Sequence, residues 1–446
     1  MEVKDKNIIV YGLGVTGISS IKALSQLGAN IYVYSDQIDD KFHETIELNK
    51  EYITGFFESV DDIDWQPIDL LLKSPGIKMD RPIILAAEKA NVDVITDIEL
   101  AYRLWPELKI ISLTGTNGKT TTTSLISHLL FTGGIKNKVV GNIGIGILQE
   151  IMEYGKDYVY VCEVSSFQLA ASKTFRTKWA CILNIREDHL DWHGSLESYV
   201  DAKLQLTKNQ NEDDLVILNH DDQYYDLTVS STKAHIRSIS TSQELEEGIY
   251  CLDNDVFIDN VKTNLKRDNL HLVGKHNTQN MLFAIEIARA FNLDEDTIIK
   301  GLESFKAIEH RVEPVKTIKG VQYINDSKGT NVDSTVNALL GFKEPVILLA
   351  GGYDKKANYK PLFTTGANIK CFILLGATKF DIAEECENFD QDFIIVENLE
   401  EAVTLAKDIS MEKDIVLFSP ACASWDMYHD YEERGRHFKE LVCGIE

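Results

Sequence analysis

Residues 113–124 read LTGTNGKTTTTS and follow directly on an apolar run. Gly118, Lys119 and Thr120 match the end of the phosphate-loop pattern G-x-x-x-x-G-K-[ST], but leucine holds the pattern's first glycine position and the glycine here is Gly115. In such a loop the lysine reaches the β- and γ-phosphates and the hydroxyl of Thr120 can ligate Mg²⁺. Helix capping would explain the threonines, but not Gly-Lys-Thr after an apolar strand. The stretch therefore predicts a strand, a nucleotide loop and a helix.

A second glycine motif lies near the start of the chain. Gly12, Gly14 and Gly17 form G-x-G-x-x-G between an apolar strand and an amphipathic helix, and Asp36 follows at the end of the next strand. This is the dinucleotide fingerprint, with an acid for the ribose, and taken alone it indicates an NAD-dependent dehydrogenase. The pyrophosphate of a nucleotide sugar suits the same helix N-terminus, and a purely structural tight turn is a third interpretation.

Acidic residues at strand ends offer ligands for the cation that a phosphate loop needs. Glu163 ends the apolar run YVYVC, where a carboxylate suits Mg²⁺ directly or through water, although such a strand end can also simply reach solvent. Residues 184–194, NIREDHLDWHG, hold two histidines and three acids on one loop after a strand. In isolation this segment is equally typical of a solvated run of charges.

The composition limits the class of protein. A chain of 446 residues is too long for one ordinary core and predicts about three domains. A net charge of −25 repels nucleic acid and anionic membrane, so we expect neither as a partner. The seven scattered cysteines, with no C-x-x-C pair, are typical of reduced thiols. The start of the chain goes straight into a strand and a glycine turn, without a signal peptide, and no apolar stretch approaches the ~20 residues of a membrane span, so we expect a cytoplasmic protein.

Strand and helix patterns alternate in three segments. Residues 1–106 predict a small doubly wound sheet. Residues 107–309 begin again with a strand and the nucleotide loop, pass through short strands at 220–270, and include a clear amphipathic helix at 276–291. Residues 310–446 predict a third α/β unit. The fold class is therefore α/β in three domains.

Taken together, these motifs resemble those of the Mur ligase family over nearly the whole chain, and most closely its D-glutamate-adding members. The resemblance rests on GLGVTGIS, KSPGI, TGTNGKTTT, GNIG, EVSSFQL, REDHLDWH, YVDAK, GKHNTQN, EHRVE, NDSKGTN, GGYDKKAN and SPACASWDMYHDYEERG. The family's ATP loop has the short T-G-T-N-G-K-[ST] form, which accounts for the leucine. The Asp-Asn-Pro-Arg motif of members that add diaminopimelate or lysine is absent. Folylpolyglutamate synthase shares the ATP loop but would lack the GLGVTGIS domain.

The resemblance implies a fold and an activity. It implies a Rossmann-like N-terminal domain for the UDP-substrate, a central P-loop ATPase-type domain, and a Rossmann-like C-terminal domain that brings the amino acid and closes over both. The implied reaction joins D-glutamate to UDP-N-acetylmuramoyl-L-alanine with ATP, through an acyl phosphate and a tetrahedral intermediate, in cytoplasmic peptidoglycan precursor synthesis. We expect a monomer. A dehydrogenase would instead bind NADH, and a nucleotide-sensing module would bind ATP and UDP ligands without turnover.

The resemblance also assigns site residues. It implies that ATP is bound by Gly115, Thr116, Asn117, Gly118, Lys119, Thr120, Thr121, Asn277, Asn280, Arg311, Asp326 and Lys328. It implies that the UDP-substrate is bound by Gly14, Val15, Thr16, Asp36, Ser74 and Asn142, and D-glutamate by Lys355, Ser424 and Tyr431. Lys356, next to Lys355, is the second candidate for that cation, and Tyr431 stands where many members have phenylalanine.

Metal ligands and catalytic residues are assigned in the same way. The resemblance implies two Mg²⁺ ions, the first held by Thr120 and Glu163 and the second by His189 with Glu163 shared. It implies that Lys203 carries a carbamate formed from CO₂ and serves as a further metal ligand. Lys119, His189 and Lys203 are the expected catalytic residues. Without the resemblance, Lys203 in SYVDAKLQLT would be interpreted as an exposed helix lysine.

Overall fold

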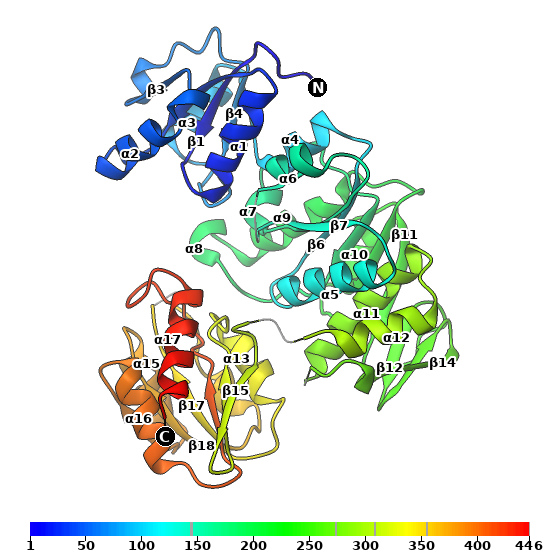
Figure 1. Ribbon diagram of the computed structural model, residues 1–446, viewed down its shortest axis with the longest axis vertical. Coiled ribbons are helices and arrows are strands. Elements are labelled where there is room, and N and C mark those ends of the chain that lie inside the picture. Colours follow the sequence, from blue (N-terminus) through cyan, green and yellow to red (C-terminus); the bar gives the residue numbers. More distant parts are fainter. Residues whose placement is uncertain (143–145, 273, 307–308, 354–355, 446) are drawn as a thin grey trace. The chain divides into compact units, whose positions relative to one another are not determined.

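The computed structural model describes residues 1–142, 146–272, 274–306, 309–353 and 356–445 (Figure 1). The chain divides into two compact units, one of Met1–Asn269 with Gln279–Glu303 and one of Leu270–Thr278 with Ser304–Glu446. The first unit holds a five-stranded and a nine-stranded sheet, and the second unit holds a six-stranded sheet. The domain boundaries at 106/107 and 309/310 therefore stay predictions.

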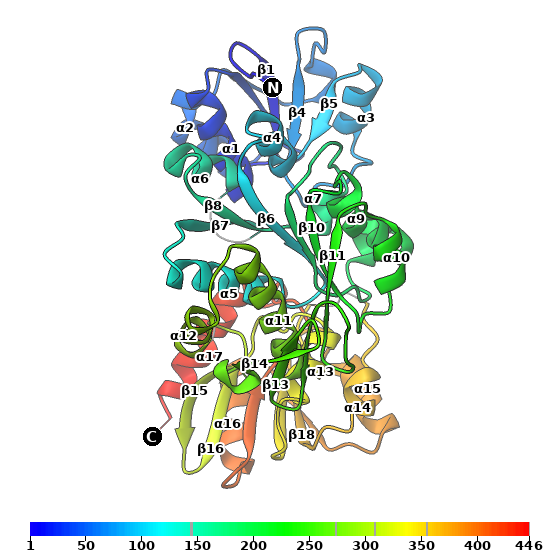
Figure 2. The ribbon, with the colours of Figure 1, turned by 90° about the vertical axis from the view of Figure 1, so that its right-hand side faces the viewer.

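The first sheet is parallel and has the order β3-β2-β1-β4-β5. Because successive side chains of a strand point to opposite faces, Ile8 and Val10 of β1 pack with the core that includes Leu24 of α1, while Ile9 packs with the core that includes Ile84 of α3. Helices thus cover both faces, as seen in Figure 2. The elements are β1 (Asn7–Tyr11), α1 (Val15–Gln26), β2 (Asn30–Tyr34), α2 (Asp40–Leu48), β3 (Gly55–Phe57), β4 (Leu70–Lys73), α3 (Pro82–Lys89), β5 (Asp93–Ile95) and α4 (Asp97–Leu104).

The second sheet has the order β14-β13-β12-β11-β10-β9-β6-β8-β7 and is parallel except for the β12-β13-β14 meander at one edge. The strand that precedes the phosphate loop, β6, lies between β9 and β8. From β6 the chain continues to β7 and β8 on one side of β6 and then to β9 on the other side. In open α/β sheets, ligands bind at the carboxyl ends of the strands at such a switch point. The strands are β6 (Lys109–Thr114), β7 (Asn137–Gly141), β8 (Val159–Glu163), β9 (Trp179–Ile182), β10 (Leu215–Asn219), β11 (His235–Ser240), β12 (Ile249–Leu252), β13 (Asp255–Ile258) and β14 (Val261–Lys266).

Helices around this sheet carry several of the predicted site residues. Buried side chains of the first and second sheets belong to one continuous hydrophobic cluster, so the two sheets share a core. The helices are α5 (Lys119–Thr132), α6 (Ile147–Tyr154), α7 (Ser166–Leu169), α8 (Leu190–His193), α9 (Leu196–Lys208), α10 (Tyr225–Ser230), α11 (Lys275–Ala290) and α12 (Glu295–Ser304).

The third sheet has the order β15-β16-β20-β17-β18-β19, with only β15 antiparallel to its neighbour. Leu348 of β17 packs with the core that includes Ile382 of α15, and Leu349 packs with the opposite core that includes Val403 of α16 and Phe438 of α17. The elements are β15 (Glu313–Ile318), β16 (Val321–Asn325), α13 (Val332–Leu339), β17 (Val346–Ala350), α14 (Pro361–Thr364), β18 (Ile369–Leu374), α15 (Lys379–Asn388), β19 (Phe393–Ile395), α16 (Leu399–Ile409), β20 (Ile415–Phe418) and α17 (Tyr431–Cys443).

Several of the observed helices and strands agree with those expected from the sequence, but some short strands were not expected. The α/β class, the strand before the nucleotide loop and the long helix α11 agree with expectation. The strands β3 and β5 lie at the edges of the first sheet and have three residues each, which is too short for a periodic pattern to show in the sequence. Among the described residues, no helix has the length and apolar character needed to cross a membrane.

Candidate active site

The loop between β6 and α5 has the geometry of a nucleotide loop. Gly118, at the N-cap of α5, has φ of 84°, a conformation that side chains with a Cβ rarely adopt. A Cβ built there would lie 2.5 Å from Oδ1 of Asn280 on α11. The backbone conformation therefore favours glycine at this position, and a Cβ there would also displace the side-chain oxygen of Asn280. The N-terminus of a helix presents backbone N–H groups and the positive end of the helix dipole, which makes the start of α5 suited to phosphate.

Asn184 holds the phosphate loop from the neighbouring strand, and sequence reasoning missed it. The N–H of Asn117 donates to Asn184 Oδ1 at 2.9 Å, and Asn184 Nδ2 donates to the Asn117 carbonyl at 3.0 Å. The N–H of Thr116 donates to the Asn184 backbone carbonyl at 2.9 Å. The available signal was a polar residue just beyond the apolar strand β9, at the same sheet edge as the loop.

Lys119 and the threonines after it lie at the start of α5. Lys119 Nζ donates to the carbonyls of Gly115 at 2.8 Å and Thr116 at 2.9 Å, so its ammonium lies over the loop. Thr121 is buried, and the hydroxyl of Thr122 donates to Asn280 Oδ1 at 3.1 Å. Asn280 therefore braces α5 in this structure.

Two predicted metal ligands contact each other. The Thr120 hydroxyl donates to Glu163 Oε2 at 2.9 Å, and Asn142 Nδ2 donates to Glu163 Oε1 at 3.0 Å. Glu163 ends β8 and is only 2% exposed, so the strand end does not reach solvent. Asn142, assigned above to the UDP-substrate, lies on the carboxylate of Glu163 here. Hydroxyl and carboxylate oxygens are hard donors of the kind that Mg²⁺ prefers.

Lys203 is buried, which rules out an exposed helix lysine. It is 1% exposed on α9, and its Nζ donates to the carbonyl of Gly115 at 2.8 Å. The same Nζ lies 4.6 Å from the ring centre of Tyr199, one helical turn earlier. Burial, reinforced by the charge of Lys119, holds the pKa of Lys203 well below its usual value. A buried amine with a lowered pKa is an unusual feature beside a phosphate loop.

His189 lies in the loop after β9 and has φ of 54°. Its Nε2 is 3.6 Å from the carboxylate of Asp188, and its ring packs edge-on against Phe167 at 4.9 Å between centres. Tyr199, missed by sequence reasoning, links this region to the phosphate loop, since its hydroxyl lies 3.0 Å from that of Thr116. The signal for Tyr199 was its i, i+4 spacing from Lys203 on one helix.

The glycine motif of the first sheet forms a tight strand-to-helix turn. A Cβ on Gly17 would lie 2.0 Å from the Gly12 carbonyl, and the Ser74 hydroxyl donates to that carbonyl at 3.2 Å. Gly14 is the N-cap of α1, and nothing lies within 4 Å of a Cβ built there. The helix start, with Val15 and Thr16 in its first turn, is therefore open on the side where the motif predicts a diphosphate.

Asp36 has partners of its own in the first sheet. The hydroxyl of Tyr11 donates to Asp36 Oδ2 at 2.5 Å, and Arg81 Nε is 3.8 Å from the same oxygen. Burial and the adjacent Asp36 raise the pKa of Tyr11, so this phenol stays protonated and donating. Asp36 is thus placed by the fold at the end of β2, as the fingerprint predicts.

In the second unit, Asp326 is the most unusual of the predicted residues. It follows β16 and is buried; the Ser419 hydroxyl donates to its Oδ2 at 2.6 Å and the Val312 N–H to its Oδ1 at 3.2 Å. Burial raises the pKa of Asp326 to about 6, against the opposing effect of the Ser419 hydrogen bond. Arg311 adjoins Val312, and its charge also favours the ionised carboxylate.

Of the other predicted residues of this unit, Lys328 and Ser424 lie on loops, whereas Tyr431 and Asn277 lie in the first turns of helices. Lys328 Nζ is 4.8 Å from the ring centre of Tyr431, the first residue of α17. Ser424 is buried, and its carbonyl accepts from the N–H of Tyr428 at 2.8 Å. Asn277 lies in the first turn of α11, where its N–H donates to Gly274. Lys355 lies outside the described residues.

Arg434 joins the loops around Ser424, and sequence reasoning missed it although it lies in the quoted motif. It is 1% exposed, and its guanidinium donates to the Ser327 carbonyl at 2.7 Å, to the Cys422 carbonyl at 3.1 Å and to the Ala423 carbonyl at 3.1 Å. Burial lowers the pKa of Arg434 to about 10, which leaves it charged at neutral pH. A fixed cation therefore organises the loops that carry Ser327 and Ser424.

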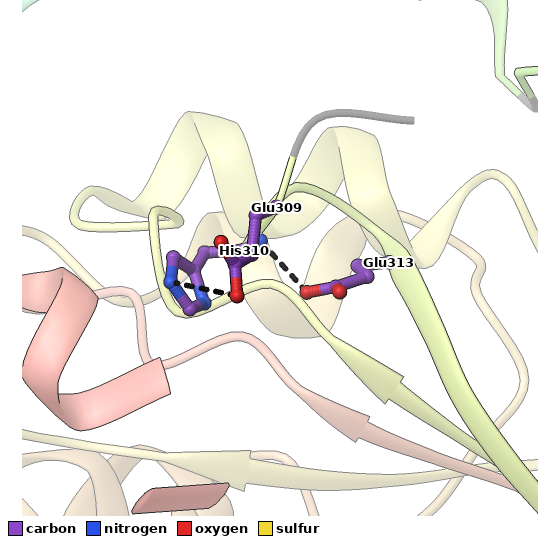
Figure 3. A group of neighbouring side chains, drawn as sticks. All are labelled: Glu309, His310 and Glu313. Carbon is purple, nitrogen blue, oxygen red and sulfur yellow. Dashed lines mark hydrogen bonds and ion pairs between the residues drawn. The ribbon is translucent and has the colours of Figure 1, made fainter. Parts of the chain in front are cut away.

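A group with metal-ligand chemistry occurs in the second unit (Figure 3), formed by Glu309, His310 and Glu313. Lys439 Nζ lies 2.7 Å from both carboxylates, and the His310 Nδ1 lies 2.8 Å from the side-chain amide of Asn325. These partners already satisfy the group, so it is described here as an ion-pair cluster.

Three family profiles match successive parts of the chain. Residues 6–96 match the Mur ligase MurD-like N-terminal domain, residues 113–288 the Mur ligase middle domain, and residues 310–422 the Mur ligase glutamate ligase domain.

Curated relatives align end to end with this chain. A UDP-N-acetylmuramoylalanine--D-glutamate ligase of Clostridioides difficile is 40% identical over 456 residues, and one of Alkaliphilus oremlandii is 38% identical over 456 residues, each alignment covering 100% of both chains. Among solved structures, UDP-N-acetylmuramate-alanine ligase MurC from Thermotoga maritima has a TM-score of 0.60 at 22% identity, covering 99% of this chain and 100% of that one. MurF from Acinetobacter baumannii has a TM-score of 0.61 at 14% identity, covering 99% and 90%. At these identities the two structures establish the fold alone.

Proposed function

This chain belongs to the Mur ligase family, and we propose that it joins D-glutamate to UDP-N-acetylmuramoyl-L-alanine with ATP, in the synthesis of peptidoglycan precursors. The observation that carries the proposal is end-to-end identity of 38–40% to ligases with that activity in their names. An intact phosphate loop with buried metal-type donors beside it supports the same reaction class.

The phosphate loop binds the triphosphate of ATP. The backbone amides at the start of α5 and the ammonium of Lys119 face the phosphates, with the side chain of Lys119 leaving its two loop carbonyls for the γ-phosphate. The electrostatic repulsion is large because the triphosphate of ATP must approach a carboxylate of the substrate. Fixed positive groups of the protein offset this repulsion. Mg²⁺ bound at Thr120 and Glu163 would neutralise further phosphate charge, and the paired hydroxyl and carboxylate fit such an ion.

The reaction has two steps in this proposal. A carboxylate oxygen of the UDP-substrate attacks the γ-phosphorus, the bond to ADP breaks, and an acyl phosphate forms. The amine of D-glutamate then attacks the acyl carbon, and the tetrahedral intermediate collapses with loss of inorganic phosphate and of one amine proton. Phosphorylation is needed because a carboxylate alone is a poor electrophile.

Lys203 would act as a carbamate in this proposal, and His189 would be a ligand of a second Mg²⁺. A cationic lysine beside the Gly115 carbonyl would repel a metal ion, whereas its carbamate is an anionic oxygen donor. Reaction with CO₂ requires a neutral amine, and burial favours this form of Lys203.

Substrate binding follows the family assignments. The open N-terminus of α1 takes the UDP diphosphate, with Ser74 bracing the turn beneath it. D-Glutamate brings two carboxylates to a protein of net charge −25, so it needs a fixed cation, which we assign to Lys355 with Ser424 and Tyr431 as further contacts. We propose that the enzyme acts as a monomer in the cytoplasm.

The deciding experiment measures phosphate release with ATP, Mg²⁺ and UDP-N-acetylmuramoyl-L-alanine, comparing D-glutamate, L-glutamate, L-lysine and diaminopimelate. We expect release only with D-glutamate. Release with another amino acid would assign the chain to another branch of the family. Tight ATP and UDP binding without turnover would reject the ligase and favour a sensing module, and NADH binding with enhanced fluorescence would favour a dehydrogenase.

A further inference from the structure

The geometry points to Trp192 as a positioning residue that couples occupancy of the UDP-substrate loop to occupancy of the phosphate loop. This inference rests on the proposed function, because it concerns how two of the proposed substrates assist each other's binding. Trp192 lies on α8, within the loop that carries His189, and no role in the reaction has been assigned to it above.

One side of Trp192 contacts the loop KSPGIK, residues 73–78, of the first sheet. Its indole Nε1–H donates to the carbonyl of Gly76 at 2.9 Å. A second bond runs beside it, from Lys78 Nζ to the carbonyl of Asp191 at 2.6 Å. The two loops are far apart in sequence, so only the fold brings them together. Any movement of the loop around Ser74 when a diphosphate binds is therefore passed to α8.

The KSPGIK loop is stiff enough to transmit such a movement. Lys73 is 1% exposed, and its ammonium donates to the carbonyl of Ile77 at 2.9 Å and that of Pro75 at 3.2 Å. These bonds tie the loop to a single buried cation. The same ammonium lies 5.8 Å from the Trp192 ring centre, so the cation contacts both partners.

The other side of Trp192 belongs to a ring cluster, which we define as Phe167, His189, Trp192, His193 and Tyr199. Phe167 lies 4.9 Å from Trp192 and 4.9 Å from His189, between ring centres. His193 lies 4.5 Å from Trp192 and 5.2 Å from Tyr199. Tyr199 is buried and the other four rings are half-buried, and at these distances each ring contacts the next. A displacement of one ring therefore acts on its neighbours.

The ring cluster ends at the phosphate loop. The Tyr199 hydroxyl is 3.0 Å from that of Thr116, and the ring of Tyr199 lies against Lys203. His189 belongs to the ring cluster and Lys203 contacts it through Tyr199, and both residues are proposed to act in the reaction. A continuous set of contacts runs from the Gly76 carbonyl to Thr116, and binding at either end restricts the other.

The test uses Trp192→Phe, which keeps an aromatic ring and removes the indole donor, and Lys78→Met, which removes the second bond from the opposite loop. Trp179→Phe is the matched control, since Trp179 lies at the start of β9 and its ring packs against Phe291, which follows α11. The affinity of the full-length protein for a non-hydrolysable ATP analogue with Mg²⁺ is measured by calorimetry, without and with saturating UDP-N-acetylmuramoyl-L-alanine.

In the wild type and in Trp179→Phe we expect the UDP-substrate to tighten binding of the analogue by a factor within about 5- to 150-fold, the usual range of coupling between sites. In Trp192→Phe, and to a lesser degree in Lys78→Met, this factor should fall toward one, while each ligand alone binds nearly as in the wild type. A purely structural role would instead weaken each ligand alone and leave the factor unchanged.

Two results would overturn the inference: no coupling in the wild type, or wild-type coupling in Trp192→Phe. Phosphate release with D-glutamate by the wild type is measured in parallel. Its absence would reject the proposed function, whereas normal release with unchanged coupling would reject only the role of Trp192.

Discussion

At the scale of single residues, burial decides what Lys203 can do. An ammonium with one carbonyl partner and an aromatic ring beside it is a costly group to keep charged, which is why its pKa is lowered. Lys208, in the last turn of the same helix, is exposed. The packing of α9 therefore decides which lysine of this helix is removed from water.

We expect Lys203→Ala to lose most ligase activity, on the order of 10²- to 10³-fold in kcat, the scale for a single positioned electrostatic group. Short carboxylic acids added to the assay should restore part of it by supplying the missing oxygen donor. Lys203→Arg should stay inactive, because a guanidinium does not form the carbamate. Lys208→Ala on the same helix is the control, and a fully active Lys203→Ala enzyme would reject the carbamate.

The raised pKa of Asp326 implies that the stability of the folded protein depends on pH. Its pKa is raised to about 6 in the folded protein, above that of the unfolded chain, so the folded state holds a proton more tightly. This contribution is fully present below about pH 4 and is lost as the pH rises through about 6.

We therefore expect the free energy of unfolding of the second unit, which holds Asp326, to fall by about 1 kcal/mol in the wild type relative to Asp326→Asn between pH 5.5 and 7.5. An asparagine side chain has nearly the shape of aspartate but cannot ionise. The stability of the Asp326→Asn variant therefore lacks the pH-dependent contribution of this carboxyl. Urea unfolding of both proteins at the two pH values measures the difference, and parallel curves would show that Asp326 titrates normally.

At the scale of elements, the start of α5 depends on Gly118 and on the helix that packs against it. Left-handed backbone conformation disfavours alanine by roughly 1–2 kcal/mol at any such position. Gly118 and Gly134 both have positive φ, but a Cβ at Gly118 would also lie 2.5 Å from Oδ1 of Asn280, whereas nothing lies within 4 Å of a Cβ built at Gly134, where φ is 77°.

The comparison of Gly118→Ala with Gly134→Ala separates the two effects. Both should lower the free energy of unfolding through backbone strain, but only Gly118→Ala should also weaken ATP binding, by displacing α11 or the loop amides. Urea unfolding and titration with a fluorescent ATP analogue measure both quantities. Equal ATP affinities in the two variants would show that the contact with Asn280 is easily relieved.

At the scale of the whole molecule, the division into two compact units predicts two unfolding transitions. The positions assigned to UDP all lie in the first unit, so UDP should raise the midpoint of one transition and leave the other unchanged. Trp425 is in the second unit, and the remaining tryptophans, at 65, 105, 179 and 192, are in the first. Fluorescence of Trp425→Phe in urea should therefore lose the signal of the UDP-independent transition. A single transition shifted as a whole by UDP would contradict two independent units.

The sequence by itself determined the α/β class, the strand before the nucleotide loop and the family, because these depend on local patterns: apolar runs, glycines at fixed spacing and residues in consecutive order. It also placed Glu163 at a strand end and Lys119 at a helix start, since both positions follow from neighbours in the chain.

Only the tertiary structure decided which distant residues meet. Asn184 bonds to Asn117, Trp192 to Gly76, and Arg434 to the carbonyl of Ser327, and none of these pairs is close in sequence. Burial of Lys203 likewise depends on the packing of α9 against the loop, which a helical pattern alone does not reveal. The physical reason is that pKa values, contacts and coupling depend on the surroundings in space, and a parallel sheet assembles those surroundings from strand ends separated by whole helices.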